Sequence, residues 1–153
     1  MKGFALTTNV LIGGAIVGAL FLWGFVGLVF GGSVDFDWPQ RYPLQFLVVC
    51  LVAPVLEEYV FRGVLFEAIQ RRWVWRWPDR GEASLSIANL ITTALFILLH
   101  YITRDPITAA LVLLPSLYLG LVKEVSGKIG VCIFVHVFWN IVWALGLREV
   151  MTW

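Results

Sequence analysis

Five long runs of apolar residues, separated by short polar segments, limit what this chain can fold into. They cover residues 4–30, 43–69, 85–102, 107–122 and 129–147. An α-helix needs about 20 apolar residues to cross the hydrocarbon core of a bilayer, and connections of a few residues make neighbouring helices antiparallel. We therefore predict an all-α, polytopic membrane helix bundle of about five transmembrane helices, built as one domain over residues 1–153.

The composition excludes an ordinary soluble domain. Of the 153 residues, 60% are apolar and 14% are charged, whereas soluble domains have about 45–50% apolar and about 25% charged residues. The formal net charge is +1, and the sequence has no basic stripe of the kind that binds nucleic acid. Cys50 and Cys132 both lie in apolar runs and show neither zinc-type spacing nor a disulfide framework. We expect lipid as a partner and no nucleic acid.

The basic residues predict how the bundle lies in its membrane. Cytoplasmic loops carry the excess of Lys and Arg, and a cytoplasmic N-terminus places seven basic residues inside against three outside. The inner set is Lys2, Arg71, Arg72, Arg76, Arg80, Lys123 and Lys128, and the outer set is Arg41, Arg104 and Arg148. We expect a multi-pass protein of the inner (plasma) membrane, with the N-terminus in the cytoplasm and the C-terminus outside. Trp73, Trp75 and Trp77 would anchor it at the inner headgroup level.

Six polar or charged side chains lie inside the apolar runs, where an ionisable group is costly and has a partner or a function. They are Glu57, Glu58, Arg62, His100, His136 and Asn140. At about 1.5 Å of rise per helical residue, these positions in three spans fall in one band of depth. Hydrogen bonding between helices is one interpretation of such residues. A polar site shared by the second, third and fifth helices is the interpretation we favour.

Helical spacing separates the roles of the two adjacent carboxylates. Glu58 and Arg62 are four residues apart, in the order that favours an ion pair within one helix. Glu57 points about 100° away from Glu58 and cannot fully share that pair. Pro54, one turn before the acidic pair, should loosen the helix and free backbone groups beside the charges. Glu57 is therefore the carboxylate left for another task.

These residue types suit hydrolysis by an activated water. Peptide hydrolysis needs a nucleophile, a base and donors for the oxyanion. The hydroxyl and thiol groups of the apolar runs have no base nearby in sequence, so water is the remaining nucleophile. Glu57 is the candidate general base, with His100 sharing the water. His136 and Asn140, on one helix face, are candidate donors to the oxyanion.

Two other uses of the same residues stay open. Glu57, His100 and His136 form a three-ligand set of the kind found in catalytic zinc sites, although the sequence has no HExxH helix motif. We expect no cofactor, with zinc as the alternative. Intramembrane carboxylates and histidines also carry ions or protons, but the sequence has no internal repeat of the transporter kind.

Three short motifs in a fixed order carry a family resemblance. They are EEYVFRG at residues 57–63, Phe96-x-x-x-His100 and His136-x-x-x-Asn140, each inside an apolar run. Together they resemble the motifs of the CPBP family of intramembrane proteases (CAAX protease and bacteriocin-processing, also called Abi), which includes the type II CAAX prenyl endopeptidases. The resemblance covers about residues 54–140, so the first predicted helix lies outside this motif core.

The resemblance implies a glutamic-type intramembrane endopeptidase. By the pattern of the family, Glu57 and His100 activate the water, while His136 and Asn140 bind the oxyanion. The implied substrate is a membrane-associated peptide or a C-terminal signal.

Glu58 and Arg62 match the second Glu and the Arg of the first motif, which implies that they support the site or orient the substrate. The family was long described as metalloproteases, so zinc stays the alternative here too. Bacteriocin self-immunity, in which the same fold protects the producing cell, is the alternative function that the resemblance implies.

Overall fold

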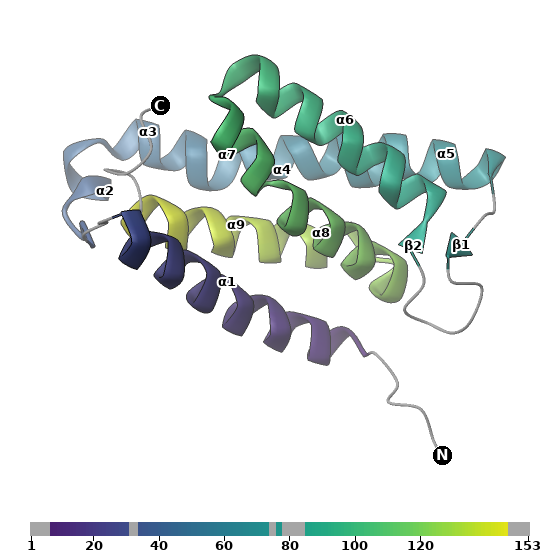
Figure 1. Ribbon diagram of the computed structural model, residues 1–153, viewed down its shortest axis with the longest axis horizontal. Coiled ribbons are helices and arrows are strands. Elements are labelled where there is room, and N and C mark those ends of the chain that lie inside the picture. The colour runs from purple at the N-terminus through teal and green to yellow at the C-terminus, as the bar shows by residue number, and fades with distance from the viewer. Residues whose placement is uncertain (1–6, 31–33, 74–75, 78–84, 147–153) are drawn as a thin grey trace.

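The computed structural model describes residues 7–30, 34–73, 76–77 and 85–146 (Figure 1). Its elements are α1 (Thr8–Phe30), α2 (Trp38–Arg41), α3 (Pro43–Leu47), η1 (Val48–Val52), α4 (Ala53–Glu58), η2 (Tyr59–Leu65), α5 (Phe66–Arg72), β1 (Arg76–Trp77), β2 (Leu85–Ser86), α6 (Ile87–Thr103), α7 (Pro106–Leu111), α8 (Leu113–Ser126) and α9 (Ile129–Gly146), where η1 and η2 are π-helical. The two short strands pair antiparallel, with Arg76 opposite Ser86. Lys2, Trp75, Arg80 and Arg148, which contributed to the predicted orientation and anchoring, lie outside the described residues.

The elements from α3 to α5 form one continuous helix of 30 residues. In η1, the amide of Ala53 donates to the carbonyl of Val48, five residues earlier. The next bond of this pattern would need an N–H on Pro54, which has none, so the carbonyl of Val49 lacks its helical donor. The side chain of Asn140 in α9 supplies one instead, with Nδ2 at 2.9 Å from the Val49 oxygen. The predicted loosening of this helix at Pro54 is therefore confirmed, and it links the helix to α9.

Helix α9 is the element against which the rest of the bundle packs. It contacts α1, α4 and α8, while α6 packs on the other side of α8 and against η2 (Figure 1). Trp139 Nε1 donates to the carbonyl of Ala15 at 2.9 Å, and the Tyr118 hydroxyl donates to the carbonyl of Leu11 at 2.5 Å, so one buried and one partly buried hydrogen bond tie α1 to the bundle. The largest apolar core lies between α1, α8 and α9 and consists of Leu11, Ala15, Ala19, Leu119, Val122, Cys132, Val135, Trp139 and Trp143.

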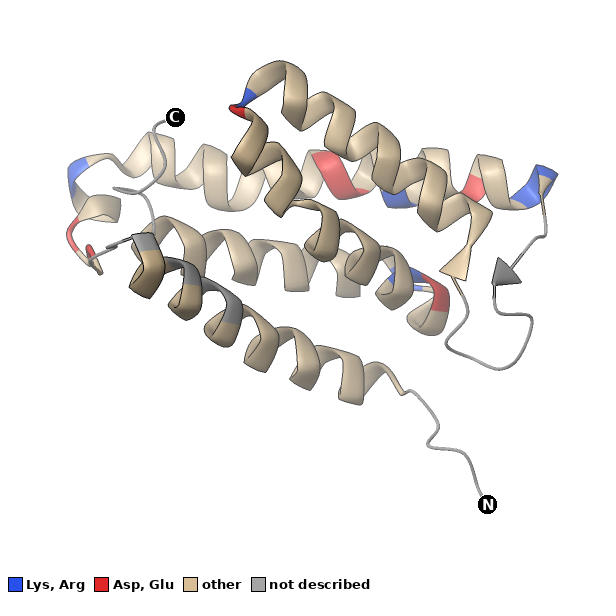
Figure 2. Ribbon diagram, in the orientation of Figure 1, with Lys and Arg blue, Asp and Glu red and all other residues tan. Residues whose placement is uncertain are grey.

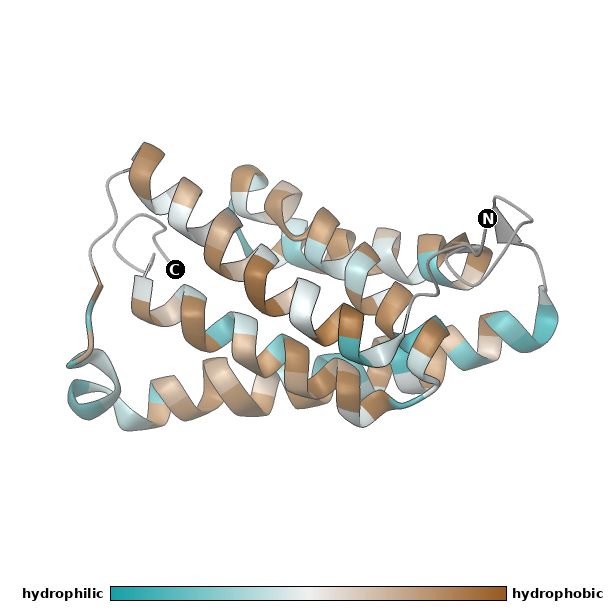
Figure 3. Ribbon diagram, turned by 90° about the horizontal axis from the view of Figure 1, so that it is seen from below, coloured by the Kyte–Doolittle hydropathy of each residue, from teal (hydrophilic) through white to brown (hydrophobic). Residues whose placement is uncertain are grey.

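The outer surface of the bundle is apolar. Large side chains such as Phe21 (77%), Leu28 (84%) and Ile102 (74%) are mostly exposed, and apolar residues run along the outside of the helices in Figure 3. Figure 2 shows the charged residues mostly near helix ends, with a further acidic band midway along the long helix at α4. A surface of this kind is suited to lipid, because few polar groups face outward. The predicted all-α membrane helix bundle is confirmed.

Length and composition qualify three helices of the described residues for crossing a membrane. These are Pro43–Arg72, Pro106–Ser126 and Ile129–Gly146, and two shorter apolar stretches, Thr8–Phe21 and Ile87–Thr103, fall in the first and third predicted runs. The predicted number of about five crossings stays a prediction, because the two shorter stretches do not meet the same length.

The fourth run differs from its prediction in two ways. It is interrupted at Val112, between α7 and α8, and α8 continues to Ser126, ending at Gly127 with a φ of 65°. Lys123, expected in a cytoplasmic loop, therefore lies within α8. Its side chain is only 8% exposed, and its Nζ lies 2.9 Å from Glu67 Oε1 in α5. The two residues are far apart in the sequence, so local patterns did not reveal this ion pair.

Candidate active site

All four residues that we predicted from the sequence to be catalytic line one cavity of about 240 Å³. Glu57 reaches it from α4, His100 from α6, and His136 and Asn140 from α9. The remaining wall is largely apolar: η1, α7 and α8 contribute to it, and so do further residues of α4, α6 and α9. The fold thus places a carboxylate, two imidazoles and an amide around one space.

The imidazole of His136 lies between the two adjacent carboxylates. Its Nδ1 is 2.8 Å from Glu58 Oε1, and its Nε2 is 3.6 Å from Glu57 Oε2. The side chain of Glu58 is fully buried, whereas that of Glu57 is 25% exposed. The two carboxylates therefore differ in position: Glu58 contacts His136 Nδ1 within the protein interior, and Glu57 contacts His136 Nε2 and lines the cavity.

Arg62 is the counter-ion of Glu58, as the four-residue spacing predicted. Its Nη1 lies 3.1 Å from Glu58 Oε1, and both side chains have no exposed surface. The guanidinium also lies over the ring of Phe96, 4.9 Å from its centroid, which adds a cation–π contact. Glu58 Oε1 thus accepts from the Arg62 cation and lies in position to accept a hydrogen from His136 Nδ1 as well.

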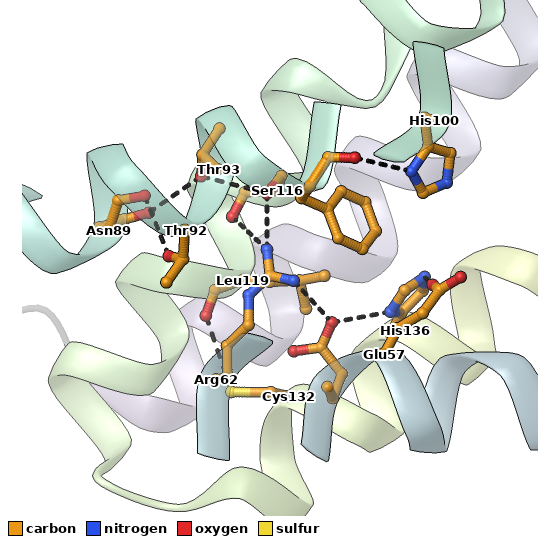
Figure 4. A network of polar contacts seen from close by, with 12 residues as sticks. Glu57, Arg62, Asn89, Thr92, Thr93, His100, Ser116, Leu119, Cys132 and His136 are labelled. Carbon is orange, nitrogen blue, oxygen red and sulfur yellow. Dashed lines mark hydrogen bonds and ion pairs between the residues drawn. The ribbon is translucent and has the colours of Figure 1, made fainter. Parts of the chain in front are cut away.

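A chain of polar side chains continues from Arg62 into α8 and α6 (Figure 4). Arg62 Nη2 donates to Ser116 Oγ at 2.7 Å and to the Ser116 carbonyl at 2.9 Å. Ser116 Oγ donates to Thr93 Oγ1 at 3.1 Å, and Thr93 donates to Asn89 Oδ1 at 3.3 Å. Ser116 also lines the cavity. The buried ion pair is thus attached to two further helices.

His100 is oriented by its own helix. Its Nδ1 is 3.0 Å from the carbonyl oxygen of Phe96, and its ring lies 4.4 Å from the Phe96 ring, centroid to centroid. A carbonyl oxygen only accepts, so Nδ1 carries the hydrogen and Nε2 keeps its lone pair. His100 can therefore accept a hydrogen bond at Nε2 from a group in the cavity.

Asn140 uses one of its two N–H donors to hold the carbonyl of Val49. A side-chain amide nitrogen carries a second hydrogen, and Asn140 lines the cavity. The same residue can thus close the gap left by Pro54 and still offer a donor to a bound group.

Arg104 lies in the cavity wall at the C-terminal end of α6. Burial lowers the pKa of its guanidinium, and the negative charges of Glu57 and Asp105 oppose that shift. The sequence had placed Arg104 only in an outer loop, so its position beside the catalytic candidates is new information from the structure.

The predicted alternative set of metal ligands does not come together. Within the described part of the chain, no group of three or more His, Cys, Asp or Glu side chains is close enough to hold a metal ion. Glu57 Oε2 and His136 Nε2 lie 3.6 Å apart, and the Nδ1 atoms of His136 and His100 contact Glu58 and the Phe96 carbonyl. Glu57, His100 and His136 are therefore not gathered closely enough in this arrangement to hold one ion, and the absence of a cofactor stays a prediction.

Sequence reasoning missed the polar residues of α6 and α8 that hold the ion pair. Asn89, Thr93 and His100 are spaced by four and seven residues, which places these polar side chains along one helix face. That pattern was a usable signal, since a polar stripe on an otherwise apolar membrane helix faces a partner. Ser116 offered no comparable signal, because it is isolated in an apolar run.

Comparison with known proteins identifies the family. The model of one family, described as type II CAAX prenyl endopeptidase Rce1-like, matches residues 39–142. Comparisons with curated proteins and with solved structures gave no match. The matched segment begins in α2 and ends in α9, so it contains all residues that line the cavity except Trp143. Because the match spans more than half of the 153 residues, the chain belongs to the type II CAAX prenyl endopeptidase Rce1-like family of membrane proteases.

Proposed function

We propose that this protein is a glutamic-type intramembrane endopeptidase, which hydrolyses a peptide bond of a membrane-associated peptide or C-terminal signal with an activated water. The observation that supports this proposal best is the convergence of Glu57, His100, His136 and Asn140 on one cavity. Membership of a prenyl endopeptidase family supports the reaction class.

In the proposed first step, Glu57 acts as the general base. Its carboxylate takes a proton from water, and the water oxygen forms a bond to the carbonyl carbon of the substrate. His100 accepts the second hydrogen of the same water at Nε2, which orients the oxygen for attack. The carboxyl of Glu57 then returns its proton to the leaving amine as the C–N bond breaks. The products are a carboxylic acid and an amine, so atoms and charges balance.

The charge that develops on the substrate oxygen is stabilised by His136 and Asn140. In the proposed step His136 carries a hydrogen on both ring nitrogens, so that Nδ1–H donates to Glu58 Oε1 while Nε2–H lies on the side of Glu57. Nε2–H can donate to the oxyanion once Glu57 has been neutralised by the proton from water. Asn140 adds its second N–H.

The proposed reaction uses no cofactor, and every step is carried by side chains of this chain. The proposed partners are membrane lipid and the membrane-associated peptide. We further propose an inner-membrane location with a cytoplasmic N-terminus and an external C-terminus. Reporter fusions at the two ends test that orientation, and a reporter that is active on the same side at both ends would contradict it.

The test of the proposal is cleavage of a membrane-spanning reporter peptide by the purified protein in liposomes, with products identified by mass spectrometry. Glu57→Gln, His100→Ala, His136→Ala and Asn140→Ala should each lose most of the cleavage. Asp37→Asn is the matched control, because it changes an exposed carboxylate in the same way away from the cavity. Wild-type cleavage by Glu57→Gln would overturn the proposal, and Glu57-dependent proton flux without cleavage would favour ion translocation.

A further inference from the structure

The polar side chains Arg62, Ser116, Thr93 and Asn89 form a hydrogen-bonded network behind the cavity, in which every hydrogen bond is donated in the same direction. Arg62 donates to Ser116, Ser116 donates to Thr93, and Thr93 donates to Asn89 Oδ1. Asn89 Nδ2 closes the chain by donating to the carbonyl of Leu117 at 3.1 Å. Each hydroxyl accepts one hydrogen bond and donates one, so the orientation of each group is set by its neighbours.

Burial makes this polar network costly wherever a member lacks a partner, as Arg62 Nε does among the described residues. Arg62, Asn89 and Ser116 have no exposed surface, and Thr93 is 3% exposed. Buried polar groups at membrane depth need partners within the protein, because lipid provides none. A network of this kind either holds its members in one arrangement or destabilises the fold.

The approach of α6 to α8 is shaped around the end of this chain. At Gly120 in α8, an added Cβ would lie 1.9 Å from Asn89 Oδ1, so only glycine leaves room for the amide. In Figure 4, Asn89 and Thr93 extend from the α6 ribbon toward Ser116, and Arg62 reaches Ser116 from the other side. The close packing of α6 on α8 therefore depends on the glycine at position 120, and it brings the side chain of Asn89 into the polar network.

We infer that Asn89, Thr93 and Ser116 are positioning residues, which fix the guanidinium of Arg62 and through it Glu58 and the imidazole of His136. The argument is one of contacts: Ser116 binds Arg62 Nη2, Arg62 Nη1 binds Glu58 Oε1, and Glu58 Oε1 binds His136 Nδ1. At the end of this series, His136 Nε2 lies 3.6 Å from Oε2 of the cavity-facing carboxylate of Glu57. The inference rests on the proposed role of His136 in the reaction.

The neighbouring threonines of α6 provide a matched pair of variants. Thr93 and Thr92 are both buried, but among the described residues Thr92 Oγ1 bonds only to the Ala88 and Asn89 carbonyls of its own helix. Thr93→Val and Thr92→Val therefore both remove a threonine hydroxyl from adjacent sites, and only Thr93→Val interrupts the hydrogen-bond network that leads to Arg62. In α8, Ser116→Ala has Ser126→Ala as its control, since Ser126 Oγ donates to Val122 in its own helix.

The first readout does not depend on catalysis. The chain contains 2 His, so the imidazole NMR spectrum of the full-length protein holds signals of His100 and His136 alone, and His100→Gln assigns them. Thr93→Val and Ser116→Ala should shift the Nδ1–H resonance of His136, whereas Thr92→Val and Ser126→Ala should leave it in place. A His136 resonance that is the same in Thr93→Val and Thr92→Val would overturn the inference.

The second readout is the split between kcat and KM for the reporter peptide. A reacting group displaced by about 1 Å loses about a hundredfold in rate, so we expect Thr93→Val and Ser116→Ala to lower kcat by about ten- to a hundredfold with KM within twofold. Thr93→Ser should restore kcat, because it keeps the hydroxyl. Equal kcat losses in Thr93→Val and Thr92→Val would also contradict the inference. If His136→Ala itself keeps full activity, the proposed function fails, while the resonance shift still decides the positioning role.

Discussion

Replacing Arg62 by methionine removes the guanidinium and keeps an unbranched side chain in its place. In the wild-type protein, Arg62 and Glu58 form an ion pair with no exposed surface on either side. Glu58 Oε2 has no hydrogen-bond partner among the described residues, so the carboxylate depends on the contacts of Oε1 with Arg62 and His136. The variant would leave Glu58 Oε1 with His136 as its partner and would remove the two hydrogen bonds that Arg62 Nη2 donates to Ser116.

The expected loss of stability is large. Breaking a buried ion pair by removing one partner costs about 3–5 kcal/mol, because a charge stays buried without compensation. For a protein of this size, 1 kcal/mol shifts the midpoint of thermal unfolding by about 2–4 °C, so we expect Arg62→Met to lower it by roughly 6–20 °C. Thermal unfolding of the purified protein in detergent measures this shift.

The exposed ion pair between Arg41 and Asp35 provides the control. The Arg41 side chain is 55% exposed, and exposed pairs contribute about 0–1 kcal/mol, so Arg41→Met should change the midpoint by a few degrees at most. The double variant Glu58→Gln/Arg62→Met should be more stable than Arg62→Met, because it removes the uncompensated charge. If Arg62→Met is no less stable than Arg41→Met, our account of the buried pair is wrong.

Three further predictions concern packing, capping and metal. Gly120→Ala should destabilise the bundle by about 1–3 kcal/mol through overpacking against Asn89, whereas Gly13→Ala, where an added Cβ meets nothing within 4 Å, should not; an unchanged unfolding midpoint for Gly120→Ala would refute the close approach. Hydrogen bonds from the side chain and then the backbone of Thr108 lower the pKa of Asp105, so this carboxylate stabilises the start of α7 above its unfolded pKa, and that contribution disappears as the pH falls through its folded pKa. The unfolding midpoint of Asp105→Ala should thus lie below that of the wild type at neutral pH, and a gap that persists in acid would contradict the assignment. Treatment with a chelator should leave peptide cleavage unchanged, and activity that is lost and then restored by stoichiometric zinc would sink the metal-free mechanism.

Sequence patterns predicted those parts of the structure that depend on neighbours along one helix. The apolar runs located the long helices, because crossing a bilayer requires a minimum length. The spacing of Glu58 and Arg62 predicted their ion pair, since residues four apart share a helix face. Because Pro54 has no backbone N–H, we predicted a local change in this helix, but we did not predict that the turns before Pro54 would be π-helical.

The contacts between helices were beyond such reasoning. Ser116 bonds to Arg62 across 54 residues of sequence, and Lys123 pairs with Glu67 across 56. These partners depend on how far each helix is rotated about its axis, and an almost uniformly apolar helix shows little periodicity from which to infer that rotation. The contact between His136 Nδ1 and Glu58 Oε1 is also a contact between helices that the sequence did not predict. It distinguishes the role of Glu58 from that of Glu57.

The central claim is that Glu57 removes a proton from the attacking water. The most direct measurement compares wild type and Glu57→Gln for both binding and cleavage of the same reporter peptide in liposomes. We expect the dissociation constant to stay within a few fold while the cleavage rate falls by about 10²–10⁴-fold, as removal of a general base requires. An unchanged cleavage rate in Glu57→Gln would contradict the assignment of Glu57 as the base.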